Sequence, residues 1–505
     1  MTTLVDVFEQ LLSATRSAFS QQRTFTHIRQ LAYGFVSAWG RRTISRALCA
    51  CHAQFEDWSA SYRVFSRSPW EPTDLFQPVL ETCLVQSSAT GPFAIALDDT
   101  SLKKTGRRIP GVSYCRDPMS PAFHFNLRRG QRFIQASALL RPEGLNGPAR
   151  SIPIRFHPAP PPPKPGKRAD EAAHEAYRLA KKTQNLSCQA ARLIQEIRET
   201  INRSGYANRN ILLAVDGSYC NKNVLNNLPD KVEVIARARG DINLFLPISD
   251  ADIATKGRRR KYGPQLPKPK DIRTSDDYPW LQGRIFGAGR LHDLKYKVVS
   301  NVLWRSGTRT KPLKLIIIAP LRYRPTAKSK LLYRDPAYLL TTDFNTPVET
   351  QIQAYFDRWE IEVNHRDEKD LFGVGQAQVW SEKSAYRVPQ FQVAIYSMLL
   401  LAALVAYGPK RTDNYLPQPK WRKKEERRPS TLDILALLRE ELLQLAVSNP
   451  PLPRIEIQSS GGTQTSCLKS MPSYRIIASS SGSQFHPTQQ KSPVDIITAA
   501  LYASS

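Results

Sequence analysis

The stretch from Tyr355 to Lys369, which reads YFDRWEIEVNHRDEK, constrains the possible folds of this chain more than any other. If it is helical, each residue advances about 100° around the helix axis. Arg358, Glu362 and Lys369 then share a wedge of roughly 60° with Tyr355, spread over about four turns. A neighbouring apolar stripe at helical spacing consists of Ile352, Phe356, Trp359 and Val363. One face can therefore be buried while the next presents an aromatic ring, a guanidinium, a carboxylate and an ammonium group.

The sequence also indicates where this helix begins. Thr346 is a favourable N-cap, Pro347 suits the first helical position, and Glu349 completes a capping box. We therefore expect one continuous helix from there to Lys369. Its polar face has two interpretations: a solvated row of ion pairs, or a metal-binding Glu362 whose neighbours hold phosphates. The order of the four polar residues favours the second, which requires further carboxylates elsewhere in the chain.

The chain carries a large excess of positive charge. Its 505 residues have a formal net charge of +28 and an isoelectric point near 9.9. A surplus of this size indicates a polyanionic partner, most simply nucleic acid, with a membrane surface as the alternative. The longest apolar run, Phe391 to Tyr407, is at the short limit for a membrane span and contains Gln392 and Ser397. We interpret it as a buried core helix and expect no membrane association.

The seven cysteines indicate a reducing compartment, because they are odd in number and scattered along the chain. Cys49, Cys51 and His52 are neighbours, but no second pair of ligands follows at zinc-finger spacing, so we assign them a structural role. The N-terminus shows no charged segment followed by an apolar one, as a secretory signal would have. These features predict a cytoplasmic protein.

Residues 1–88 are predicted to form a helical N-terminal domain. Helices are expected over Leu4–Ser20 and Phe25–Trp39. The segment Arg41–Leu48 is predicted to be a short helix that begins with two arginines. Such a helix has two equal interpretations: it enters a major groove, or it packs on the domain with a solvated arginine edge.

Two short apolar runs are each followed directly by an acid. Phe93–Leu97 precedes Asp98, and Ile211–Val215 precedes Asp216. Apolar runs of this length are typical of buried strands, so both acids are expected at strand ends. Strand-end acids and a helix-face Glu362 can converge on Mg²⁺ or Mn²⁺, which prefer oxygen ligands. Two such ions activate an attacking oxygen and stabilise a leaving one.

The first acid is ambiguous because Asp98 and Asp99 are adjacent. Side chains alternate along a strand, so the two carboxylates point to opposite faces. Asp98 shares its face with Ala94 and Ala96, whose small side chains leave room for a helix. We therefore favour Asp98 as the metal ligand and keep Asp99 as the alternative.

A linker, a helix and further strands are expected in the remaining central part of the chain. The Pro-rich linker is placed near residues 152–168, and a long amphipathic helix over Ala169–Ser204. The basic loop 256–263 contains Arg258, Arg259 and Arg260, which are expected to contact phosphates rather than be simply solvated. Strands are predicted over Arg132–Leu140, Val232–Ile235, Lys297–Leu303, Leu313–Ile318 and Tyr338–Thr342.

Residues 409–505 differ in composition from the rest of the chain. A basic run over Trp421–Arg428 is followed by a predicted helix over Thr431–Leu445, which Ser430 caps together with Asp433. From Gln458 the chain is rich in serine and poor in apolar residues, which is typical of a mobile tail.

The polar face of the key helix resembles the signature of a known family. DDE transposases of the IS4 type carry Tyr, Arg, Glu and Lys separated by two, three and six residues, and within this type the chain most resembles the IS701-like group. Tyr355, Arg358, Glu362 and Lys369 match this signature at every position. The two strand-end acids also resemble the family's Asp motifs, in Asp98-Asp99-Thr100 with Lys103 and Lys104 after it, and in Asp216-Gly217-Ser218-Tyr219.

The resemblance implies an α/β fold with an RNase H-like catalytic core, in which a mixed sheet is flanked by helices. This core would span residues 89–408 and include a β-rich insertion at about 232–342. It would follow a helical DNA-binding domain at 1–88 and precede the basic C-terminal helix and tail at 409–505. The protein would be cytoplasmic, nucleoid-associated and of bacterial type.

The resemblance also implies a Mg-dependent DNA transposase that cuts element ends and transfers strands. Asp98, Asp216 and Glu362 would hold two Mg²⁺ or Mn²⁺ ions, while Trp280 and Trp304 are candidates for clamping a flipped base. The partners would be double-stranded DNA, at terminal inverted repeats and target, and a second copy of the chain in a homodimer on DNA. The residues expected to contact DNA are Tyr355, Arg358, Lys369, Lys103, Lys104, Arg258, Arg259 and Arg260.

Three other functions are consistent with parts of the sequence. A domesticated, catalytically silent DNA-binding protein would keep the charge without needing all three acids. A nuclease of the same fold would cut without strand transfer. A membrane-associated basic protein rests only on the net charge and the apolar run Phe391 to Tyr407.

The net charge leads to a prediction about affinity for duplex DNA. Each phosphate contact releases condensed counterion, so raising salt from 50 to 200 mM should weaken binding by about 10³-fold or more if six or more phosphates are contacted. Fluorescence anisotropy of a labelled duplex measures this. An affinity that changes less than about threefold over that range would contradict a polyanionic partner.

Overall fold

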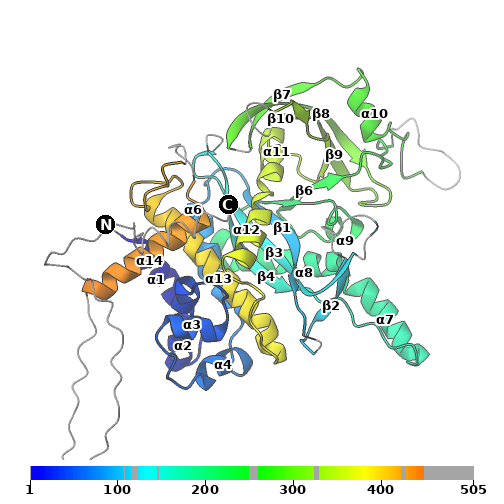
Figure 1. Ribbon diagram of the computed structural model, residues 1–505. Helices are drawn as coiled ribbons and strands as arrows, with labels where there is room; N and C mark the ends of the chain where they lie inside the picture. Colours follow the sequence, from blue (N-terminus) through cyan, green and yellow to red (C-terminus); the bar gives the residue numbers. More distant parts are fainter. Residues whose placement is uncertain are drawn as a thin grey trace, which may run out of the picture. The chain divides into compact units, whose positions relative to one another are not determined.

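The computed structural model describes residues 2–106, 108–116, 123, 126–144, 147–248, 260–287, 289–323, 329–421 and 428–448. The chain divides into two compact units, Met1–Glu441 and Leu442–Ser505. Among the described residues, the first unit contains all the strands and all the helices (Figure 1) except the last turns of α14, Thr431–Ser448, which fall in the second. The predicted serine-rich tail lies outside the described residues.

The N-terminal region is helical, as predicted. Its helices pack on one long helix near the C-terminal end of the unit, α13, Glu382–Tyr407. The ring of Phe391 in α13 contacts the rings of Phe35 and Phe65, with centroids 5.9 and 5.4 Å apart. The helices are α1 (Leu4–Ala14), the short η1 (Thr15–Ala18), α2 (Gln22–Ser37), α3 (Ile44–Ala50), α4 (Ser59–Ser66), α5 (Pro72–Leu75) and α6 (Gln77–Gln86).

Helix α13 contains the long apolar run. By length and composition it could cross a membrane, but 94% of its most apolar window is buried inside the protein. Its polar interruptions bond internally: the Gln392 amide donates to the carbonyl of Phe372 at 3.0 Å, and the Ser397 hydroxyl donates to that of Val393 at 2.8 Å. The prediction of a buried core helix is therefore confirmed.

One ten-stranded sheet forms the centre of the first unit. Nine strands follow the order β2-β3-β1-β5-β6-β12-β9-β8-β7, and β4 pairs with β3 beside this path. Strands β10 (Arg322–Tyr323) and β11 (Leu332–Tyr333) form a separate pair. The ten strands are β1 (Phe93–Lys103), β2 (Val112–Arg116), β3 (Leu127–Leu140), β4 (Arg150–Pro158), β5 (Ile211–Val215), β6 (Val232–Ala238), β7 (Leu281–Gly287), β8 (Arg290–Leu303), β9 (Pro312–Ile318) and β12 (Ala337–Thr341).

The sheet is mixed, as the RNase H-like prediction requires. Strand β1 is antiparallel to β3 and parallel to β5, which is in turn parallel to β6. Strand β12 then joins β6 in antiparallel pairing, so the strands from the predicted insertion extend the same sheet. Helices flank it, among them α8 (Leu186–Ile201) and α13, while α9 (Lys222–Leu225) and α10 (Pro269–Thr274) are short.

Two predicted boundaries between the acids were wrong. The expected linker begins too early, because residues 150–158 form the buried strand β4 along β3 and only the later prolines lie outside it. The expected single helix over Ala169–Ser204 is two helices, α7 (Glu171–Thr183) and α8. Asn185 separates them because its side chain caps α8, accepting the N–H of Cys188 at 3.0 Å.

The key helix is also divided, into α11 (Val348–Asp357) and α12 (Glu360–Asp370). The predicted capping box is absent, because Thr346 is held in a turn by the Asp343 carboxylate, which accepts its N–H at 2.9 Å. Pro347 is the residue before α11 instead, without a side-chain cap. The break also moves Trp359 out of the apolar stripe, and its exposed fraction is 61%.

The C-terminal helix begins as predicted. Ser430 donates to the Asp433 carboxylate through its N–H and its hydroxyl, at 2.9 and 2.8 Å. The N–H of Asp433 donates back to the Ser430 hydroxyl at 3.2 Å. This reciprocal capping box fixes the start of α14.

The close approach of α2 and α3 leads to a stability prediction. A Cβ added at Gly34 would lie 2.4 Å from the carbonyl oxygen of Ala47, so Gly34→Ala must push the helices apart. The clash should outweigh the helix-propensity gain and lower stability by about 1–2 kcal/mol. Thermal unfolding measures the loss. Gly166→Ala is the control, since its Cβ meets open space, and an equal effect of both changes would contradict the packing argument.

Candidate active site

The register of the sheet places Asp98 and Asp216 side by side, directly after the paired segments of β1 and β5. We call this position the β1–β5 edge. Parallel pairing of β1 with β5 ends at Leu97 opposite Val215, so the next residues of both strands lie level. Strand β1 does not end there, as the sequence suggested, but continues to Lys103 paired with β3 alone. Asp98 is therefore at the end of the parallel pairing rather than at the end of its strand.

The Asp98 carboxylate is largely buried, with 17% of its side chain exposed. One oxygen accepts the N–H of Asp99 at 2.8 Å, and the other lies 3.4 Å from Nη1 of Arg358. Burial, and then the negative charge of Asp216, raise the pKa of Asp98 to about 7, against the opposing effect of Arg358. Two carboxylates that repel each other at a buried edge attract cations.

Glu362 reaches the same place from helix α12. Its Oε1 lies 3.3 Å from Nη2 of Arg358. Burial raises the pKa of Glu362, while the charge of Arg358 opposes the rise and that of Asp216 adds to it. Arg358 thus lies between Asp98 and Glu362, with only 11% of its side chain exposed, and links β1 to α12.

Asp99 makes different contacts from Asp98. One of its oxygens accepts the hydroxyl of Tyr219 at 3.1 Å, and the other pairs with Nε of Arg132 at 3.1 Å. Asp99 is thereby tied to the loop after β5 and to β3. The sequence did not assign this bracing role to Tyr219, although its place three residues after Asp216 was part of the family motif.

Asp216 is oriented by its own turn. Its Oδ1 accepts the N–H of Ser218 at 2.9 Å and the Ser218 hydroxyl at 2.7 Å. Strand β6 contributes Arg237 beside it, because Val215 pairs with Ala236 and the following residues are level. The sequence analysis did not identify Arg237. The feature that could have indicated it is a basic residue near the end of β6, the strand parallel to β5.

Tyr355 and Lys369 complete the signature around these acids. Burial raises the pKa of Tyr355, and the charges of Arg237 and Arg358 oppose this; the Arg358 guanidinium lies 5.9 Å from the ring centroid. Burial, and then the charge of Arg128, lower the pKa of Lys369, while nearby acids including Asp98 raise it. The structure therefore gathers all four signature residues near the β1–β5 edge.

Two further titratable residues of α12, His365 and Glu368, are buried beside the site. Burial raises the pKa of Glu368 to about 8 and lowers that of His365 to about 3. Burial therefore favours the uncharged form of both side chains.

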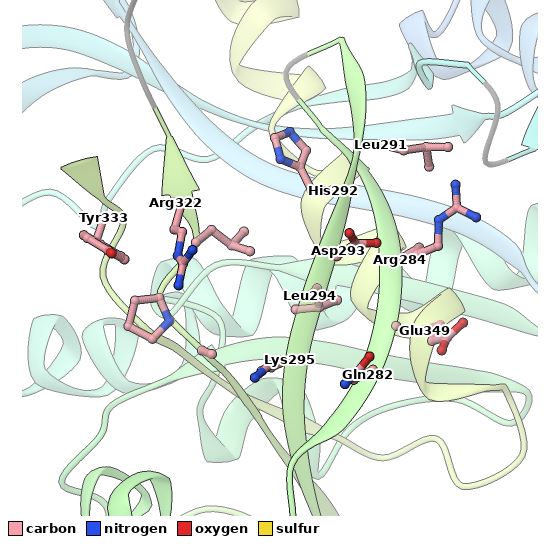
Figure 2. A pocket seen from close by; sticks show the side chains of 14 residues that line it. Gln282, Arg284, Leu291, His292, Asp293, Leu294, Lys295, Arg322, Tyr333 and Glu349 are labelled. Atoms are coloured by element: carbon pink, nitrogen blue, oxygen red, sulfur yellow. The ribbon is translucent and has the colours of Figure 1, made fainter. Parts of the chain in front are cut away.

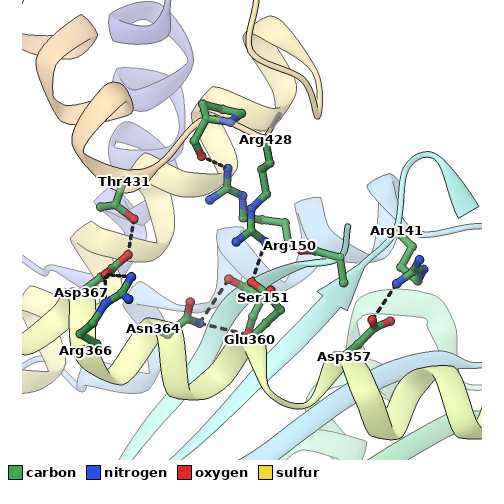
Figure 3. A network of polar contacts seen from close by, with 12 residues as sticks. Arg141, Arg150, Ser151, Asp357, Glu360, Asn364, Arg366, Asp367, Arg428 and Thr431 are labelled. Carbon is green, nitrogen blue, oxygen red and sulfur yellow. Dashed lines mark hydrogen bonds and ion pairs between the residues drawn. The ribbon is translucent and has the colours of Figure 1, made fainter. Parts of the chain in front are cut away.

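A network of polar contacts flanks the break between α11 and α12 (Figure 3). Asp357, before the break, pairs with Arg141 at 2.6 Å, and Glu360, after it, pairs with Arg428 at 2.6 Å. One turn later the Asn364 amide donates to the hydroxyl of Ser151 in β4 at 3.0 Å. These anchors on both sides of Arg358 set the position from which it reaches the two acids.

The residues predicted to contact phosphates differ in exposure. Lys103 and Arg260 are exposed, whereas Arg258 and Arg259 lie outside the described residues. Lys104 is buried, and its ammonium donates to the carbonyls of Gly375 and Ala377 at 2.7 and 3.2 Å. Burial lowers the pKa of Lys104 to about 8, so we leave this residue out of the proposed DNA contacts.

The predicted base clamp is not a single site. Trp280 lies under the Lys297 ammonium, 4.6 Å from the ring centroid, and Trp304 is half-buried against Gly307. A cavity of about 1150 Å³ does open in this region, lined by β7, β8, the β10–β11 pair and Glu349 of α11 (Figure 2). Neither tryptophan is among the residues that line it.

The three acids offer the type of ligand that a divalent metal requires. Carboxylate oxygens are suitable ligands for Mg²⁺ or Mn²⁺, and the repulsion between Asp98 and Asp216 is the kind that such an ion relieves. Among the described residues, however, no three His, Cys, Asp or Glu side chains lie close enough to hold one ion. Arg358 lies between two of the three acids. The acids are therefore chemically suited to a metal ion, but the ion would have to compete with the Arg358 guanidinium for Asp98 and Glu362.

A mixed sheet flanked by helices, with acids at the β1–β5 edge, defines an RNase H-like DDE domain. Residues 14–311 match the family described as DDE superfamily endonuclease, and the chain therefore belongs to this family. The match includes Asp98 and Asp216, whereas Glu362 lies beyond it. No curated protein matches the chain. Family membership makes DNA the expected substrate, and enzymes of this superfamily generally use divalent metals.

The raised pKa of Asp98 predicts how stability depends on pH without divalent metal. An unfolded Asp titrates near 3.9. Since the folded pKa is about 7, the contribution of Asp98 is greatest below pH 4 and is lost as the pH rises through 7. Asp98→Asn removes this loss, so the variant should match wild type at pH 4 and exceed its free energy of unfolding by about 1–3 kcal/mol at pH 8.

Denaturant unfolding at the two pH values measures this difference. The exposed Asp276→Asn is the control and should show no pH-dependent gain. A gain for Asp98→Asn that is the same at both pH values would contradict a buried, repelled carboxylate.

Proposed function

We propose that this protein is a DNA transposase of an insertion sequence, of the IS4 type and near the IS701-like group. It would cut element ends and transfer strands on double-stranded DNA by two-metal phosphoryl transfer. The observation that carries the proposal is that Arg358 contacts both Asp98 and Glu362, while Asp216 is close enough to raise the pKa of both acids. Membership of the DDE superfamily endonuclease family supports it.

Asp98, Asp216 and Glu362 would hold two Mg²⁺ or Mn²⁺ ions. Bound there, the ions would supply activation of the attacking oxygen and stabilisation of the leaving oxygen. Arg358, once released from the acids, would grip the scissile phosphate with its fork of N–H donors. Asp99 would brace the site through Tyr219 and Arg132 rather than bind metal.

The DNA would lie along the cations near the β1–β5 edge. Lys369 and Arg237 are close to the acids, and Lys103 and Arg260 are exposed farther out. We place the DNA-binding helical domain at 1–88, the catalytic domain with its β-rich extension at 89–408 and the basic C-terminal region after it. The protein would act as a homodimer on DNA in the cytoplasm, associated with the nucleoid.

The metal role of Glu362 is tested by Glu362→Gln, which keeps the size of the side chain and removes its charge. Cleavage of a labelled duplex, made from the sequence that flanks the gene, should fall to background in Mg²⁺ while binding of that duplex persists. Glu349→Gln on α11 is the matched control and should cleave normally. Full cleavage by Glu362→Gln would exclude this assignment.

The choice between the first two acids uses the same assay. Asp98→Asn should abolish cleavage, whereas Asp99→Asn should retain part of it, because only the bracing contact is lost. The reverse ranking would move the metal role to Asp99.

Lys369→Ala separates a transposase from a nuclease of the same fold. Its ammonium should hold a phosphate that the acids do not, so its loss misplaces the DNA, and a shift of about 1 Å can cost on the order of 100-fold in rate. Nicking should fall less than strand transfer, because transfer must also hold the freed end. Both steps are read on one labelled duplex, with the exposed Lys383→Ala as control. Equal losses in the two steps would favour the simple nuclease.

A further inference from the structure

Helix α7 is well formed but not covered by the rest of the protein. The Asp170 carboxylate caps it, accepting the N–H of Ala173 at 2.9 Å, yet none of its residues is buried. Figure 1 shows α7 extending away from the sheet and the other helices. A helix of this length is only marginally stable alone in water, because most helices gain stability by burying one face. The amphipathic pattern of α7 therefore calls for a partner.

The exposed face of α7 has two neighbouring rows at helical spacing. The uncharged row contains Leu179, whose exposed fraction is 62%. The charged row beside it has acids in the first half of the helix and bases in the second. The uncharged row is Ala172, Ala176, Leu179 and Thr183, and the charged row is Glu171, Glu175, Arg178 and Lys182.

This order of charges is complementary to itself. When two copies of a helix pack antiparallel about a two-fold axis, each row faces the same row of the partner in reverse order. Glu171 then opposes the Lys182 of the other copy, and Glu175 opposes its Arg178. In parallel packing the charged row would face the opposite flank of the partner's helix, so these pairs would not form. Within one chain, Arg178 already pairs with Glu171, which shows that these side chains reach along the row.

We propose that α7 is a self-association surface, on which a second copy of this chain packs antiparallel through its own α7. A DNA backbone fits the row less well, because the acidic half would repel phosphates. The helix is about 20 Å long, so the contact is smaller than the roughly 1,200 Å² of a standard stable interface. The dimer is accordingly weak, forms without DNA and depends on protein concentration and salt. This inference does not depend on the proposed catalytic function.

Charge reversal in the full-length protein tests the pairing. Sedimentation equilibrium without DNA should show a concentration-dependent dimer of the wild type at up to about 100 µM. The double variants Glu171→Lys with Glu175→Lys, and Arg178→Glu with Lys182→Glu, should each weaken dimerisation by about tenfold or more. An equimolar mixture of the two variants should recover a heterodimer of wild-type affinity.

Two controls separate this contact from general effects. Glu199→Lys changes an exposed charge on α8 and should leave dimerisation unchanged. Leu179→Asp should weaken the dimer while circular dichroism shows an unaltered fold. The proposal is overturned if the wild type stays monomeric, if the charge variants dimerise like the wild type, or if mixing them restores nothing. A monomeric wild type whose basic-half variant binds duplex DNA less tightly would make α7 a DNA surface instead.

Discussion

The paired contact of Arg358 with Asp98 and Glu362 is the interaction on which the geometry of the candidate active site depends. The guanidinium is almost fully buried and lies 3.4 and 3.3 Å from the two carboxylates. It supplies the positive charge that keeps acids ionisable at a sheet edge where burial and Asp216 raise their pKa. Without that charge, desolvation would favour the protonated acids. In the proposed enzyme, divalent ions would take over this neutralising role and free Arg358 for phosphate.

The position of Arg358 depends in turn on parts of the chain that are far away in sequence. The break between α11 and α12 is flanked by contacts to Arg141, which directly follows β3, to Ser151 in β4, and to Arg428 before α14. Glu362 and Arg428 both lie beyond the stretch that matches the DDE superfamily endonuclease family. The third acid is therefore positioned by a C-terminal part of this chain as much as by the shared core.

Features that depend mainly on residues close together in the sequence were predicted correctly. The apolar run Ile211–Val215 is strand β5 to the residue, because a short buried strand followed by Asp216 leaves little choice. The capping box of α14 and the buried helix α13 were predicted for the same kind of reason. The fold class was predicted from the family resemblance and is confirmed by the mixed sheet.

Long-range contacts decided what the sequence did not predict. Residues 355–369 have an unbroken helical pattern, yet ion pairs from Asp357 and Glu360 to distant arginines stabilise a break at Arg358. Strand β1 runs past Asp98 because β3 continues to pair with it. Lys104 is buried because carbonyls near residue 375 accept its ammonium, a contact that spacing alone does not reveal.

A crystal structure of the protein soaked in Mn²⁺, with anomalous scattering data, tests the central claim most directly. The account predicts an anomalous peak in contact with the carboxylates of Asp98 and Asp216, and an Arg358 side chain that has moved away from Glu362. Mn²⁺ that binds elsewhere, or not at all, while Arg358 still bridges Asp98 and Glu362 would contradict it.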